Sequence, residues 1–159
     1  MNTVSPQAPW SYVLQLPHDQ RAPRVARMTL RAVLTGHGMA ELVDTAELLA
    51  CELVTNAYRY SAGHATLRLR PMEGDRLRVS VWDTNPVIPA PFDQPPGVRA
   101  PLRDPAPDAR TADGGRGLFL VQGCADNWGG YPLGDDLCGW RGKLLWFELA
   151  PRAELVRAA

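Results

Sequence analysis

The stretch HATLRLRPMEGDRLRVSVWD, residues 64–83, holds two runs in which apolar and polar residues alternate. Successive side chains of a strand point to opposite faces, so each run predicts a strand with one apolar face. The residues expected on the buried face are Ala65, Leu67, Leu69, Leu77, Val79 and Val81. Gly74 and Asp75, between the runs, are a turn signal. The stretch therefore predicts an antiparallel hairpin whose other face lies in water.

Two helical patterns precede the hairpin. In PRVARMTLRAVLT, residues 23–35, apolar residues recur at roughly helical spacing, with a proline suited to the first turn and glycines just after the end. These apolar residues are Val25, Met28, Ala32 and Leu34. The second helix is expected to start at Asp44, an N-cap with Glu47 completing a capping box, and to run to about Ser61.

The remaining segments complete an α+β pattern. Strands are expected at residues 10–16, 128–133 and 143–149, and a helix at residues 118–127. Residues 84–113 contain too many prolines for a regular helix or a central strand, and a loop of this length is usually functional or disordered. The order of the elements predicts a largely antiparallel sheet with helices on one face.

Composition limits the classes of function. The chain has 159 residues, which suits one domain, and a formal net charge of zero, which gives no support for nucleic-acid or membrane-surface binding. Its three cysteines are widely spaced without a CxxC motif, so reduced thiols fit better than a disulfide framework or a zinc site. With no leader pattern and no run of ~18 apolar residues, a cytoplasmic protein is expected. We expect one domain at residues 10–150, between tails at 1–9 and 151–159.

The second predicted helix contains CELVTNAYRYS, residues 51–61, in which two polar residues lie among apolar ones. Glu52 and Asn56 are four residues apart, and at about 100° per residue both fall within the apolar sector of the helix. One interpretation is an exposed helix end, or a pair that caps backbone groups, since charged residues are mostly exposed. The other is a polar pocket under the helix, with a carboxylate for proton or water handling and an amide oxygen for a hard cation.

Two further features lie at the ends of predicted elements. Asp83 falls on the core face where the hairpin ends, so it either accepts a hydrogen bond from a ligand amine or opens a turn before Asn85 and Pro86. DGGRGLFLV, residues 113–121, places glycines before an apolar helix. Such glycines either bring backbone N–H groups close to a phosphate or only join a loop to a helix, and they match neither a P-loop nor a Rossmann fingerprint. In this order, the features together predict one nucleotide site.

Four ordered stretches carry a resemblance to a known family. They are ELVTNA (52–57), VWDTNPVIP (81–89), GGRGLFLV (114–121) and GKLLWFEL (142–149), with DNWGG (126–130) before the last hairpin. They resemble the N box, the two glycine boxes and the last strand of the histidine-kinase-like ATPase (GHKL) superfamily, over about residues 10–150. Within it, the chain looks most like the anti-sigma-factor serine/threonine-protein kinases of bacterial partner-switching systems.

The resemblance implies a Bergerat-type two-layer α/β sandwich that binds ATP and Mg²⁺. Glu52 would be the general base, Asn56 the Mg²⁺ ligand and Asp83 the reader of the adenine amine. The remaining ATP contacts would be Gly115, Arg116, Gly117 and Leu118. The activity implied is phosphoryl transfer from ATP to a serine or threonine of an anti-anti-sigma factor. A sigma factor would be a second partner. Residues 84–113 would form the ATP lid, and a homodimer is a common assembly in the family.

The chain departs from the family pattern at three places, which predicts a lower affinity for ATP. Thr84, Asn85 and Pro86 follow Asp83 where the wider superfamily has glycines. Tyr60 stands where close relatives often have histidine, and Leu144 where many have a threonine that supports adenine.

Two other functions stay open. One is a module that acts only by docking a partner, with or without bound ATP, and the presence of Glu52 favours a kinase over it. The other is the ATPase half of a larger histidine-kinase-like machine, which is disfavoured because no phospho-accepting histidine helix accompanies the domain.

Overall fold

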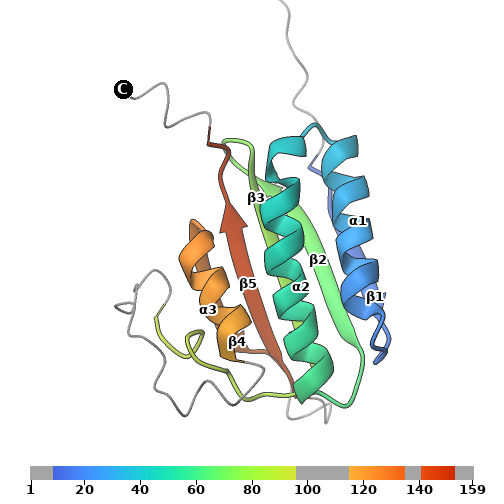
Figure 1. Ribbon diagram of the computed structural model, residues 1–159. Coiled ribbons are helices and arrows are strands. Elements are labelled where there is room, and N and C mark those ends of the chain that lie inside the picture. Colours follow the sequence, from blue (N-terminus) through green and yellow to red (C-terminus); the bar gives the residue numbers. More distant parts are fainter. Residues whose placement is uncertain (1–8, 96–114, 135–140, 153–159) are drawn as a thin grey trace, which may run out of the picture.

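The molecule is a two-layer sandwich of a sheet and helices, and the computed structural model describes residues 9–95, 115–134 and 141–152 of it. Its elements, in chain order, are β1 (Tyr12–Leu16), α1 (Ala22–Gly36), η1 (Ala40–Leu42), α2 (Val43–Tyr60), β2 (Ala65–Met72), β3 (Arg76–Asp83), α3 (Gly115–Cys124), β4 (Asn127–Pro132) and β5 (Lys143–Leu149). The strands form one antiparallel sheet in the order β1-β2-β3-β5-β4, and α1, α2 and α3 cover one of its faces (Figure 1). The predicted fold class is confirmed.

The predicted hairpin forms as β2 and β3. Leu67 pairs with Val81 across the two strands, and Leu69 pairs with Val79. Gly74 and Asp75 both have positive φ, at 73° and 57°, and lie in the short loop between Met72 and Arg76, which pair with each other at the end of the hairpin. All six residues expected on the buried face are buried under the helices.

The opposite face of the sheet is less exposed to solvent than the alternating pattern predicts. Glu148 on β5 is buried there and accepts hydrogen bonds from Arg76 and Arg78 on β3, at 3.0 and 2.8 Å. The Arg78 guanidinium also lies 4.4 Å from the ring centroid of Trp146. A Cβ on Gly129 would lie 2.7 Å from the same indole, so glycine lets the ring lie against β4. Paired charges and an aromatic ring thus cover part of the expected polar face.

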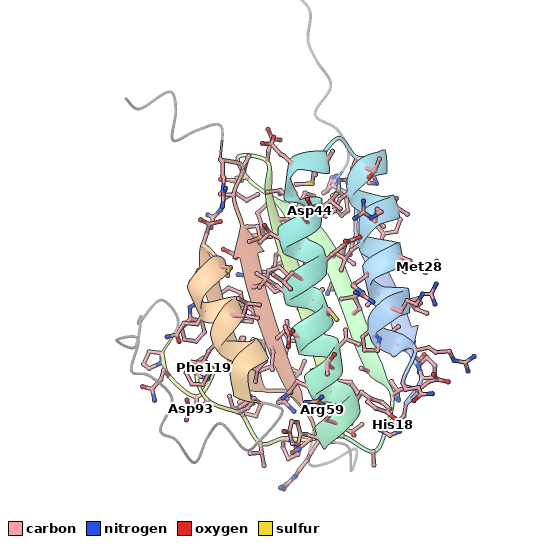
Figure 2. The ribbon with its side chains drawn as sticks, in the orientation of Figure 1. His18, Met28, Asp44, Arg59, Asp93 and Phe119 are labelled. Carbon is pink, nitrogen blue, oxygen red and sulfur yellow. The ribbon has the colours of Figure 1, made fainter. Side chains whose placement is uncertain are left out.

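The first helix has the expected length but a different buried face. Its buried residues are Ala22, Ala26, Leu30 and Leu34. Val25, Met28 and Ala32, expected among the apolar spacing, are exposed, and Met28 lies on the side of α1 away from α2 (Figure 2). The spacing of four residues places the small alanines on the packed side, where α1 contacts α2.

The predicted capping box at the start of α2 is wrong, although the predicted end near Ser61 is confirmed. The helix continues directly from the short helix η1, its N-cap is Leu42, and no side chain caps it. Asp44 lies inside the first turn. Glu47 instead accepts a hydrogen bond from Arg31 Nε of α1 at 2.7 Å, so its carboxylate joins two helices.

The later elements follow the prediction with shifted ends. The helix expected at residues 118–127 is α3, which starts at Gly115 and ends at Cys124, and β4 and β5 form the two predicted strands. Pro91 and Phe92 of the Pro-rich loop are buried. Residues 96–113 of that loop, Cys138, residues 1–8 of the N-terminal tail and residues 153–159 of the C-terminal tail lie outside the described residues. In the described part of the chain, Cys51 and Cys124 are free thiols and no helix meets the length and hydropathy needed to cross a bilayer.

Candidate functional site

Four element ends meet at one end of the sandwich. The C-terminus of α2, the end of β3, the start of β5 and the N-terminus of α3 lie together at the lower end of Figure 1. Figure 2 shows Arg59 near this end of α2 and Asp44 near the opposite end. The predicted site residues belong to these segments, so the fold brings together motifs that are far apart in the sequence.

Asn56 lies on the buried side of α2, with only 5% of its surface exposed. Its Oδ1 atom has no hydrogen-bond partner. Among the described residues, the only other buried side-chain polar atom without a partner is Gln122 Nε2. Leaving a buried amide oxygen unpaired costs free energy, so such an atom is expected to have a ligand that satisfies it. The helical wheel correctly placed Asn56 within the apolar sector.

Glu52, one turn earlier on α2, lies against the first turn of α3. A Cβ built on Gly117 would lie 1.6 Å from Glu52 Oε2, so the carboxylate fills the space that any side chain at position 117 would need. Glu52 is half-buried, at the edge of the face that contains Asn56. The N-terminal end of a helix carries a partial positive charge, which favours a carboxylate or a phosphate there. The carboxylate predicted as a base thus contacts the glycine segment predicted to bind phosphates.

Asp83 is 1% exposed and takes part in a buried ion pair. Its Oδ1 accepts a hydrogen bond from Lys143 Nζ at 2.9 Å and another from the Asn85 backbone N–H at 2.8 Å. The second bond confirms that Asp83 opens a turn, and it leaves the ligand interpretation open. The ion pair was not predicted, because Lys143 was expected only as the start of the last strand.

Lys143 could have been found from strand parity. It is the only lysine of the chain, and it alternates with the apolar residues Leu145 and Phe147, which point to the helical layer. Leu144, the position at which many relatives have a threonine that supports adenine, belongs to the other face of β5. The residue of β5 that contacts Asp83 is therefore Lys143.

The turn after β3 is fastened to the end of α2. Asn85 Nδ2 donates to the Tyr60 carbonyl at 2.8 Å, and the Ser61 and Thr84 hydroxyls lie 2.7 Å apart. The Tyr60 side chain is exposed. The main chain at Tyr60 thus positions the turn that carries Asp83.

The second glycine segment supplies the first turn of α3. Gly115 and Gly117 are in this turn, and the Leu118 side chain packs in the core, so its backbone is the part open to a ligand. The Arg116 side chain lies outside the described residues. No cluster of three or more His, Cys, Asp or Glu side chains that could hold a metal occurs in the described part of the chain.

A comparison with family models agrees with this geometry. Residues 16–132, more than half of the 159-residue chain, match the model of the histidine kinase-like ATPase domain. The chain belongs to this family. The match supports ATP as a ligand of the domain and ATP-dependent chemistry in general. The comparison with curated proteins gave no match.

The contact between Glu52 and Gly117 yields a stability prediction. Gly→Ala inside a helix usually adds up to about 1 kcal/mol to the free energy of unfolding. We expect this gain for Gly123→Ala, because a Cβ there meets nothing within 4 Å. Gly117→Ala should lack the gain, because the Glu52 carboxylate has to move. Urea unfolding of both variants measures the difference.

A double variant controls for effects unrelated to Glu52. In Glu52→Ala/Gly117→Ala the carboxylate is absent. The double variant should therefore have a larger free energy of unfolding than the single variant Glu52→Ala, because alanine at position 117 now stabilises the helix. An equal gain for Gly117→Ala and Gly123→Ala in the wild-type background would show that Glu52 does not occupy this space.

Proposed function

We propose that the chain is an ATP-dependent serine/threonine-protein kinase of the anti-sigma-factor type. It would phosphorylate an anti-anti-sigma protein in the cytoplasm and so control the availability of a sigma factor. Family membership supplies the ATP-binding domain. The observation that carries the proposal is the Glu52 carboxylate lying on the first turn of α3, next to the backbone expected to hold the phosphates. Protein partners are proposed rather than nucleic acid or membrane, since the chain has no net positive charge.

Mg²⁺ fits the residues present. Asn56 Oδ1 is a hard oxygen donor, buried and without a hydrogen-bond partner among the described residues. Mg²⁺ at phosphate-transfer sites uses few protein oxygens and completes its shell with waters and phosphates, so a site without a carboxylate cluster is compatible with it. When bound, Mg²⁺ would neutralise charge on the β- and γ-phosphates. In this proposal Asn56 is the protein ligand.

Glu52 would act as the general base. It takes the proton of the serine or threonine hydroxyl as that oxygen bonds to the γ-phosphorus, while the bond to the β–γ bridging oxygen breaks and ADP leaves. The backbone N–H groups of Gly115, Arg116, Gly117 and Leu118, in the first turn of α3, hold the phosphate oxygens in place. Asp83 accepts a hydrogen bond from the adenine amine. Positioning and electrostatics therefore carry most of the catalysis.

Calorimetric titration tests the nucleotide site. We expect the wild-type chain to bind ATP about tenfold or more tightly with Mg²⁺ than with EDTA, and Asn56→Ala to bind ATP equally under both conditions. Glu52→Gln, the matched control on the same helix face, should keep the Mg²⁺ effect. Asn56→Ala should fold normally, because it removes an amide oxygen that lacks a partner.

Two outcomes would contradict this part of the proposal. Absence of ATP and ADP binding at millimolar nucleotide would overturn the ATP site. An undiminished Mg²⁺ effect in Asn56→Ala would overturn its role as metal ligand.

Transfer of radiolabelled phosphate to an anti-anti-sigma protein tests the chemistry. Loss of a general base typically slows a reaction about 100-fold to 10,000-fold, so Glu52→Gln should bind Mg-ATP and label the partner at least about 100-fold more slowly than wild type. Labelling at the wild-type rate would remove Glu52 from the base role. Wild-type chain that binds ATP but labels no serine or threonine would be a module that acts by docking alone.

A further inference from the structure

We propose that Lys143 and Asp83 together recognise the adenine base of the nucleotide by hydrogen bonds. In this proposal the Lys143 ammonium donates a hydrogen bond to the ring nitrogen N1 of adenine, while Asp83 accepts one from the neighbouring amine. The inference rests on the proposed function, in which the site binds ATP.

Burial of both charges is the first observation. Asp83 is the last residue of β3 and Lys143 the first of β5, and the two are direct partners in the strand ladder. Each has only 1% of its surface exposed, and Lys143 Nζ lies 2.9 Å from Asp83 Oδ1. A buried ion pair is seldom more stabilising than an apolar pair of the same size. Stability alone therefore gives little reason to place these two charges here.

Unused hydrogen-bonding capacity is the second observation. A lysine ammonium has three N–H donors, and those of Lys143 have two acceptors among the described residues, Asp83 Oδ1 and the Asn85 carbonyl at 3.2 Å. Both described hydrogen bonds to the Asp83 carboxylate go to Oδ1, and none to Oδ2. The pair thus offers a ligand one donor and one acceptor side by side.

This arrangement is complementary to adenine. The Watson–Crick edge of adenine presents an amine donor at C6 beside an acceptor at N1. Guanine in the same pose presents the reverse, an acceptor at C6 beside an N1–H donor. An acceptor supplied by Asp83 and a donor supplied by Lys143 therefore match adenine at both positions.

Gly142 holds this geometry in place. A Cβ at position 142 would lie 2.2 Å from the backbone oxygen of Asp83 and 2.6 Å from the Trp82 ring. Only glycine lets the chain enter β5 so close to the end of β3. Lys143 is consequently fixed beside Asp83 before a nucleotide binds, and a preorganised donor costs little to order.

Calorimetry with an analogue that lacks one atom tests the inference. The full chain is titrated with ATP and with 1-deaza-ATP, in which a C–H group replaces N1. Losing a hydrogen bond to a charged donor should weaken binding of 1-deaza-ATP to wild type about tenfold to 100-fold. Lys143→Met lacks the donor and should bind both nucleotides equally.

A paired variant keeps the test valid if Lys143→Met fails to fold with Asp83 buried and unpaired. Asp83→Leu/Lys143→Met carries neither a charge nor a side-chain hydrogen-bond donor at this site, so it should bind ATP more weakly but bind ATP and 1-deaza-ATP equally. Equal binding of the two nucleotides by wild type, or discrimination that persists in the paired variant, would overturn the role of Lys143 and leave the ATP site standing. Absence of ATP binding by wild type would overturn the proposed function and this inference with it.

Discussion

The buried pair of Asp83 and Lys143 constrains the end of the molecule at which the site lies. Two opposite charges removed from water need each other, and removing one partner of such a pair commonly costs about 3–5 kcal/mol. The pair holds the start of β5 against the end of β3, where Gly142 permits the close approach. Asn85, in the turn after β3, is held to the Tyr60 carbonyl at the end of α2. The ion pair thus joins two strands of the sheet, and the separate Asn85–Tyr60 hydrogen bond joins this end of the sheet to the helix that carries Glu52 and Asn56.

Polar side chains from α2, β3 and β5 gather at this end of the two layers. Elsewhere α2 buries leucine, valine and alanine against the sheet, but near its C-terminus the same face presents Asn56 with an unpaired oxygen. Glu52 follows the edge of that face and reaches the first turn of α3. A hard oxygen and a helix N-terminus in one place suit a phosphorylated ligand that carries a metal ion. The family match, made independently of this geometry, supports ATP as that ligand.

Local sequence patterns predicted most of the fold and part of the site. The hairpin, the length of the helices and the place of Asn56 in the apolar sector of its helix follow from periodicity, which depends on neighbouring residues alone. The exposure of Val25 and the partner of Asp83 depend on packing between distant elements, whereas the Asp44 cap is absent because the short helix η1 continues directly into α2. Asp83 and Lys143 meet only because β5 inserts between β3 and β4, and no local pattern specifies that strand order.

The most direct test of a metal–nucleotide site at this end of the sandwich is paramagnetic broadening by Mn²⁺, a stand-in for Mg²⁺, in NMR spectra of the ¹⁵N-labelled chain. With ATP and a trace of Mn²⁺ together, the account predicts selective broadening of the Asn56 side-chain amide and the Gly117 backbone amide. Mn²⁺ without ATP should leave both signals sharp. Broadening confined to residues far from α2 and α3, with Asn56 unaffected, would contradict the account.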